Sequence, residues 1–242
     1  MQKVFERRQH LSNIDSMMRA VVLDKPGEKP RMAVFLAYVA LFHLGWIAWP
    51  WLLYPRLTAA LGEDTLAYAL VHLSLRVSVW VVPVWLYLRY VDGVDPVEYL
   101  KLRRRVGRGV LYAVLLTAVN LAGMIARFGV PHLSMARVTW NSILGTSVLV
   151  GLIEEIPYRG FMLPKFAERL NFWLANLVTS VLFVAIHLPG WMALHMLTVQ
   201  NAATIFIFGF IMGTALRWSQ SLWTPIVTHS ANDFLSYVIF RL

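Results

Sequence analysis

The sequence predicts an all-α fold: a polytopic transmembrane helical bundle with seven to eight spans. Hydrophobic residues make up 58% of its 242 residues and charged residues only 14%, an excess of apolar side chains that requires lipid as a solvent. The apolar residues form runs of the length that a ~30 Å hydrocarbon core needs. Ten Trp, nine Tyr and thirteen Phe supply aromatic rings for positions at the membrane interfaces.

Seven apolar runs are the expected spans. In chain order they are 32–53, 66–88, 110–126, a run that begins near Ser142, 172–188, 203–216 and 222–240. The charged stretch 92–108 between the second and third spans must lie outside lipid. After a predicted break at Pro189-Gly190, residues 191–199 are too short to cross, so we expect a re-entrant segment or a short helix. Counting that segment gives eight spans.

The basic residues predict the orientation of the spans. With a cytoplasmic N-terminus, seventeen Lys and Arg residues lie on the cytoplasmic face and four on the other, while Arg76 is left inside the second span. This asymmetry follows the positive-inside rule. We therefore expect a multi-pass integral membrane protein with its N-terminus in the cytoplasm.

The composition also excludes several classes of function. The chain has no cysteine, so it has no thiol nucleophile, no thiolate metal site and no disulfide. Its formal net charge is +9, but the basic residues lie between apolar runs rather than on an aromatic-rich polar face. No nucleic acid partner is therefore expected, and the partner of this charge is the lipid bilayer.

Two adjacent glutamates lie at the end of the fourth apolar run. An ionisable residue within such a run costs about 2.5–3.5 kcal/mol on insertion scales, so Glu154 and Glu155 need a reason to be there. On a helix Glu155 and Arg159 are four residues apart and share a face, whereas Glu154 points about 100° away and is free for another partner. The alternative is that both glutamates merely flank the end of a span.

The following helix carries a histidine at a matching depth. A polar turn is expected near Leu170 and Asn171, with Glu154 about sixteen residues before it and His187 about sixteen after it. An antiparallel helix hairpin would place the carboxylate and the imidazole at nearly the same level. The alternative is a structural histidine at a helix end.

The last span adds His229, Asn232 and Asp233. His229 and Asp233 are four residues apart and lie on one helical face, and an aspartate inside an apolar helix again requires a partner. Upstream, Gly209 and Gly213 form a small-xxx-small pair, which we expect to permit close packing of the helix that carries His229.

Three motifs therefore lie in order along the second half of the chain. They are E-E-x-x-x-R at Glu154, Glu155 and Arg159, F-x-x-x-H at Phe183 and His187, and H-x-x-x-D at His229 and Asp233. Together they resemble the motifs of the CAAX-protease and bacteriocin-processing family of intramembrane proteases, which includes type II CAAX prenyl endopeptidases. The resemblance covers about 142–240.

This resemblance implies an intramembrane endopeptidase that hydrolyses a peptide bond near the membrane. Glu154 and His187 would orient and deprotonate a water, while Glu155 and Arg159 would support the site. The substrate would be a peptide or protein that reaches the site from the membrane, with a prenylated C-terminus as one class. The chain then divides into a basic cytoplasmic segment 1–31, transmembrane helices without a recognised motif at 32–140, and a protease-like core at 141–242.

One residue departs from the family pattern. The resemblance implies that His229 and the residue four positions later stabilise the oxyanion, but this chain has Asp233 where the well-studied prenyl proteases have asparagine. An ionised aspartate would repel an oxyanion. Either Asp233 is protonated, or it orients His229 while Asn232 or a backbone group donates.

Two questions stay open in the sequence. Glu154, His187 and His229 form a His₂-carboxylate set that could hold zinc with one position open for water, as in a metalloprotease, although no HExxH pair is present. The resemblance favours a water activated without an obligatory metal.

The rival class of function is a non-catalytic membrane scaffold, chaperone or receptor-like partner that retains the polar cluster, and ion transport is a weaker third class.

Arg76 lies eleven residues into the second span, too deep to reach either surface easily. Its charge needs a partner or water, because intramembrane charges usually pair with one another. We expect Arg76 to contact Asp233 or Glu155 and so to connect the N-terminal half of the chain with the site.

Overall fold

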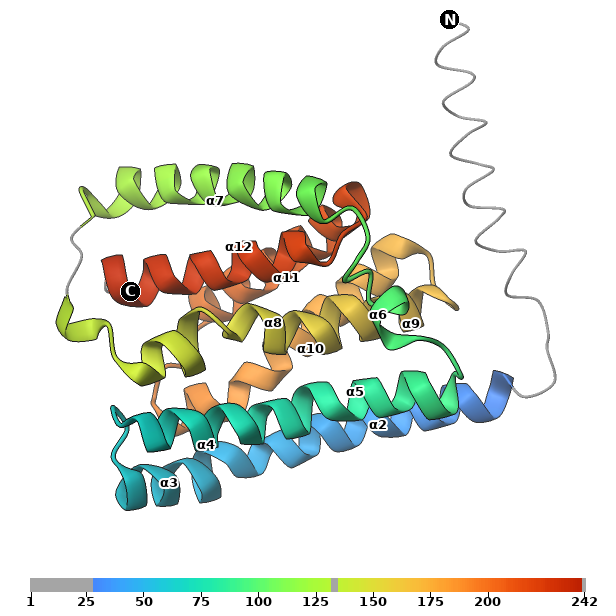
Figure 1. The fold of residues 1–242 in the computed structure, drawn as a ribbon, viewed down its shortest axis with the longest axis horizontal. Coiled ribbons are helices and arrows are strands. Elements are labelled where there is room, and N and C mark those ends of the chain that lie inside the picture. Colours follow the sequence, from blue (N-terminus) through green and yellow to red (C-terminus); the bar gives the residue numbers. More distant parts are fainter. Residues whose placement is uncertain (1–27, 132–134, 241–242) are drawn as a thin grey trace, which may run out of the picture.

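The structure, a computed structural model, describes residues 28–131 and 135–240 (Figure 1). The described chain consists of helices and their connections, with no strand, so the predicted all-α bundle is confirmed. Most of the predicted cytoplasmic segment 1–31 lies outside the described residues.

The N-terminal half forms three long helical segments. The first is α2 (Glu28–Ala48), which continues through the π turn η1 (Trp49–Leu53) into α3 (Tyr54–Leu61). The second consists of α4 (Leu66–Arg76), η2 (Val77–Val81), α5 (Val82–Leu86) and η3 (Tyr87–Val91). After the short α6 (Pro96–Tyr99), α7 (Val106–Phe128) is the third.

The C-terminal half begins with short helical pieces and ends with three longer helices. The pieces are η4 (Met135–Arg137), η5 (Ser142–Ser147), α8 (Val150–Glu155), η6 (Ile156–Met162) and α9 (Leu163–Ala167). The longer helices are α10 (Phe172–Ala193), α11 (Val199–Ser219) and α12 (Trp223–Phe234), the last of which continues into η7 (Leu235–Phe240). Proline stands at the start of several of the joints, as at Pro50 in η1 and Pro157 in η6, where its missing N–H interrupts the regular hydrogen-bond ladder.

Five helical segments of the described chain are long and apolar enough to cross a membrane. They are Arg31–Leu61, Leu66–Val91, Val106–Phe128, Phe172–Ala193 and Val199–Ser219. The predicted fourth and last spans are not among them, because both carry too many polar residues: Glu154, Glu155, Arg159 and Lys165 in the continuous helical stretch 150–167, and residues such as His229 and Asp233 in the last. The total of seven to eight spans stays a prediction.

The predicted break at Pro189-Gly190 is wrong. Helix α10 continues through Pro189 to Ala193, and the chain leaves it only before α11 begins at Val199. A proline in a membrane helix removes one backbone N–H, and packing of the helix against its neighbours can compensate for that loss. Residues 191–193 are therefore the end of α10, residues 194–198 are a short connection, and Val199 begins α11.

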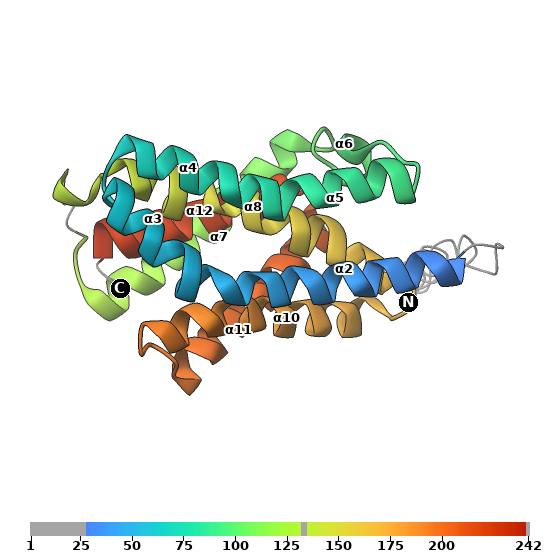
Figure 2. The same cartoon turned by 90° about the horizontal axis from the view of Figure 1, so that it is seen from below.

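Helix α8 lies in the middle of the bundle. It packs against α12 on one side and against η2 on the other, while α7 covers the opposite face of α12 (Figure 1). Helix α2 lies between the α4–α5 segment and α10 (Figure 2). Aromatic rings fill these contacts, with the Phe42 and Trp80 centroids 5.0 Å apart and those of Tyr158 and Phe183 4.9 Å apart.

Glycines set two of the closest approaches. A Cβ at Gly151 would clash with the Ile226 carbonyl oxygen and with the Ser230 side chain, so α8 can approach α12 only with glycine there. The Gly209 and Gly213 pair has a different neighbour from the one predicted. Gly213 lies against the Asn176 side chain of α10 rather than against α12.

Candidate active site

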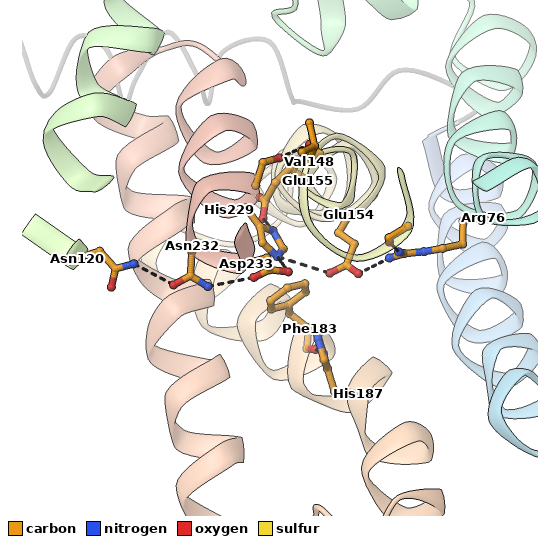
Figure 3. Close-up of polar contacts among 12 residues, drawn as sticks. Arg76, Asn120, Val148, Glu154, Glu155, Phe183, His187, His229, Asn232 and Asp233 are labelled. Carbon is orange, nitrogen blue, oxygen red and sulfur yellow. Dashed lines mark hydrogen bonds and ion pairs between the residues drawn. The ribbon is translucent and has the colours of Figure 1, made fainter. Parts of the chain in front are cut away.

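The polar side chains of the bundle meet around the end of α8. Glu154 is buried there, and its Oε1 accepts a hydrogen bond at 2.5 Å from Nη2 of Arg76, which comes from the end of α4. The other Arg76 terminal nitrogen, Nη1, donates to the carbonyl oxygen of Gly145. The Arg76 guanidinium therefore fixes one oxygen of the Glu154 carboxylate and leaves Oε2 free of it (Figure 3).

The predicted partner of Arg76 is thus wrong, although its predicted role in connecting the two halves is right. Neither Asp233 nor Glu155 bonds to Arg76 among the described contacts. The reason lies in helix packing: η2, which follows Arg76 directly, packs on α8, so the guanidinium meets the face of α8 that carries Glu154. Glu155 lies on another face, as the 100° step between neighbouring helical residues requires.

Glu155 belongs to a second ion pair. Its Oε1 accepts from Nη1 of Arg159 at 3.0 Å, as the four-residue spacing predicts, and from Nδ1 of His229 at 2.7 Å. All three side chains are buried, and the Arg159 guanidinium stacks 4.2 Å from the centroid of the Phe183 ring. Buried charges are stable only when paired and hydrogen-bonded, so this cluster holds the motif residues in place.

His229 joins both glutamates to Asp233. Because Nδ1 donates to Glu155, Nε2 is the ring nitrogen that faces the remaining acids. It lies 3.9 Å from Oε2 of Glu154 and 3.7 Å from Oδ2 of Asp233. The predicted one-turn relation between His229 and Asp233 is therefore present, with both side chains directed toward Glu154 (Figure 3).

His187 lies beside this cluster without a direct bond to it among the described residues. Its Nδ1 donates to the carbonyl oxygen of Phe183 at 2.7 Å, which leaves Nε2 as an acceptor. The Phe183 and His187 rings meet edge to face at 4.9 Å. His187 lies on α10, the helix that follows the predicted turn at Asn171, and its depth relative to Glu154 stays a prediction.

Two amides extend the cluster on the other side. Asn232 Nδ2 donates to Oδ1 of Asp233 at 3.0 Å, and Asn120 Nδ2 from α7 donates to Oδ1 of Asn232 at 2.9 Å. Asn120 is not among the site residues predicted from the sequence. The available signal was a single amide inside the apolar run 110–126, which is weak because an uncharged polar residue is far cheaper in a helix than a charge.

The possible zinc ligands do not form a recognisable metal site. Within the described parts of the chain, no group of three or more His, Asp or Glu residues is arranged to hold a metal ion. Glu154 also has Arg76 on Oε1, and a guanidinium there repels a bound cation. Zinc therefore stays an alternative that a metal measurement decides.

Comparison with known proteins gives two matches. Residues 135–235 match the family described as type II CAAX prenyl endopeptidase Rce1-like. An uncharacterized 24.3 kDa protein of Escherichia coli is 36% identical over 90 residues, a segment that covers 36% of this chain and 39% of the relative's length. No solved structure matches significantly.

The family match covers the residues of the polar cluster except Arg76 and Asn120, which lie before it. Together with the five apolar helices, it identifies an integral membrane protein. Residues 135–235 are thus similar to the type II CAAX prenyl endopeptidase Rce1-like family of CAAX-protease-like intramembrane peptidases, which confirms the family predicted from the three motifs.

Proposed function

We propose that this protein is an intramembrane endopeptidase that hydrolyses a peptide bond near the membrane with a water activated by Glu154 and His187. The observation that carries the proposal is the buried Glu154 carboxylate, whose Oε2 lies 3.9 Å from Nε2 of the buried His229. Peptide hydrolysis needs a base for the water and a donor for the oxyanion. This cluster offers candidates for both.

The two oxygens of Glu154 have different roles in this mechanism. Arg76 binds Oε1 and fixes the side chain, so Oε2 is the oxygen left to accept a proton from the water. Nε2 of His187 is a second acceptor because Nδ1 is used on the Phe183 carbonyl. Arg76 acts here as a positioning residue, since it reaches the water only through Glu154.

His229 is the proposed oxyanion donor. With Nδ1 donating to Glu155, Nε2 is free to donate to the oxyanion when the ring is protonated. Asp233 lies 3.7 Å from Nε2 and orients the ring. Asn232 is bonded to Asp233, so we assign it to that carboxylate rather than to the oxyanion. Glu155 and Arg159 support the site.

The proposed substrate is a peptide or protein segment that reaches the site from the membrane. Family resemblance favours a prenylated C-terminus, as in CAAX prenyl protease substrates, and a buried site among apolar helices suits a lipid-borne substrate. We propose no resident metal.

We also propose a cytoplasmic N-terminus. Seventeen basic residues fall on that face and four on the other, the asymmetry that the positive-inside rule describes.

A non-catalytic scaffold is the second candidate, and one observation favours it. Glu154 forms a buried ion pair with Arg76, and paired carboxylates often serve structure alone. A scaffold would bind its partner and release no product. The two candidates therefore differ in whether a bound peptide is cleaved.

The deciding experiment uses the full chain in liposomes with a farnesylated CAAX peptide and the same peptide without the lipid. We expect cleavage of the farnesylated peptide. Glu154→Gln and His187→Asn should each lower the rate by about 10²–10⁴-fold, the usual contribution of a positioned acid or base. Glu98→Gln is the matched control, because Glu98 is exposed in α6 and outside the spans.

Three results would separate the candidates. Full activity of Glu154→Gln would exclude the proposed base. Binding of the peptide with no product from the unchanged chain would favour the scaffold. Loss of activity on chelation, restored by zinc and matched by one bound zinc per chain, would replace the metal-free mechanism.

A further inference from the structure

A row of two amides ends on the Asp233 carboxylate. Asn120 in α7 donates to Asn232 at 2.9 Å, and Asn232 donates to Asp233 at 3.0 Å (Figure 3). Asp233 in turn lies beside His229. The row thus begins on a helix outside the family match and ends at a residue of the third motif.

The direction of this row is fixed by its end. A carboxylate only accepts hydrogen bonds, so the Asn232 side chain must turn its NH₂ group toward Asp233. Its carbonyl oxygen then points toward α7 and needs a donor, which Asn120 supplies. Oxygen and nitrogen of an amide are assigned from the hydrogen-bond network, and here only one assignment satisfies both bonds.

We propose that Asn120 is a positioning residue of the site, which through Asn232 holds Asp233 as an acceptor facing His229. If the Asn232 amide were reversed, its carbonyl oxygen would face the Asp233 carboxylate and repel it. Residue 233 would then have to donate, as a protonated acid or an amide does. The identity of residue 120 therefore selects which form of residue 233 fits the site.

The packing of α7 on α12 makes this contact a fixed one. Near the start of both helices, Oγ1 of Thr224 donates to the carbonyl oxygen of Gly109 at 3.0 Å. A Cβ at Gly109 would clash with the side chain of Ser221, just before α12, and would lie 3.3 Å from Cβ of Trp223 at its start, so glycine permits this close approach. This anchor sets the register along α7 that brings Asn120 to Asn232.

The balance of charge explains why Asp233 needs such support. Glu154 is paired with Arg76 and Glu155 with Arg159, which leaves Asp233 as a third acid with no guanidinium bonded to it in the described contacts. His229 at 3.7 Å is its neighbour of opposite potential charge, and the Asn232 N–H is its one hydrogen-bond donor there. If the Asn232 amide could turn either way, the Asp233 carboxylate would lose this donor for part of the time, and a buried carboxylate without a donor is unfavourable.

The simpler alternative is that Asn120 and Asn232 only hold two helices together, as amides do in many membrane proteins. Thermal unfolding of five variants in one detergent distinguishes the two: Asn120→Asp, Asn120→Leu, Asp233→Asn, and Asp233→Asn combined with each of the two changes at position 120. An aspartate at position 120 accepts only, so it reverses the row. We expect Asn120→Asp to lower the Tm by about 2–4 °C or more.

Rescue is the decisive readout. An amide at position 233 can donate to the reversed Asn232, so adding Asp233→Asn to Asn120→Asp should restore most of the lost Tm. The same addition should give no gain in the natural background or beside Asn120→Leu. Equal effects of Asp233→Asn in all three backgrounds would overturn the proposal. If Asn120→Asp fails to fold both alone and together with Asp233→Asn, rescue is absent, and this result also overturns the proposal.

The effect on hydrolysis rests on the proposed function and is measured separately. Asn120→Leu should lower kcat about tenfold with KM unchanged, because it disturbs Asp233 and not the substrate contacts. A purely structural Asn120 would leave kcat of the folded fraction unchanged and would contradict the positioning role. If the unchanged chain cleaves nothing, the proposed function fails while the Tm rescue still decides the amide row.

Discussion

The segment that matches the protease family and the segment before it contribute to the polar cluster in different ways. Residues 135–235 supply motif residues that bond to one another, as Arg159 and His229 both do to Glu155. The described residues 28–128 supply single side chains from separate helices. Arg76 comes from α4 and Asn120 from α7, and each bonds to one end of the cluster.

This difference teaches that the motifs do not make the whole site. Two residues outside the matched segment contribute to it: Arg76 pairs with the Glu154 carboxylate, and Asn120 orients the Asn232 amide (Figure 3). We therefore propose that the predicted division into 32–140 and 141–242 separates recognised from unrecognised sequence rather than two units of function.

Arg76→Leu should be the most damaging change outside the motifs. It leaves Glu154 buried without its cation, and breaking a buried ion pair in this way costs about 3–5 kcal/mol. We expect the Tm of the purified protein to fall strongly and hydrolysis to be lost. Because the two residues share one interaction, Arg76→Leu combined with Glu154→Gln should cost clearly less than the sum of the single changes.

The comparison pair for that experiment is Arg76→Leu with Asp233→Leu. Arg76 and Asp233 share no hydrogen bond among the described contacts, so the coupling of this pair should be smaller than that with Glu154. A larger coupling to Asp233 than to Glu154 would contradict the observed pairing and restore the one expected from the sequence.

Gly151→Ala tests the close contact between two helices of the matched segment. The added Cβ would meet the Ile226 carbonyl oxygen and Ser230, and overpacking of this kind costs about 1–3 kcal/mol. The control is Gly123→Ala in α7, where a Cβ would meet nothing within 4 Å and alanine favours the helix. Chemical denaturation of both proteins should show loss of stability in the first alone.

Much of this structure follows from local rules that a sequence displays. The apolar runs predict the helices, and the four-residue spacing predicts the pair of Glu155 and Arg159. The polar turn is where the sequence predicts it, because the helix that carries His187 begins after Asn171. These features depend on distances along one helix or across one turn.

The errors arise where the answer depends on how separate helices pack. Arg76 clearly needed a partner, but its choice of Glu154 over Glu155 depends on which face of α8 meets η2. Asn120 carries no charge, so its place in an apolar run does not predict that its side chain needs a partner. Pro189 predicts a break by a local rule, and the packed bundle keeps the helix instead.

Tyr158→Phe gives the smallest effect and tests a third link between the two regions. Tyr158 lies inside the first motif, between Glu154 and Arg159, and its hydroxyl is hydrogen-bonded to Nε2 of His43 in α2 at 3.2 Å. The carbonyl oxygen of Leu182 in α10 lies 3.2 Å from the same Nε2 and 3.5 Å from the Tyr158 hydroxyl, so this contact joins α2, the motif and α10. Removing the hydroxyl leaves the buried ring in place and should cost about 1 kcal/mol, the usual net value of one hydrogen bond.

Tyr99→Phe is the matched control, since the buried Tyr99 hydroxyl has no hydrogen-bond partner in the described structure, and its loss should be neutral or slightly stabilising. Thermal unfolding of the two variants side by side measures the difference, and equal Tm values would show that α2 is held to the motif by ring packing alone.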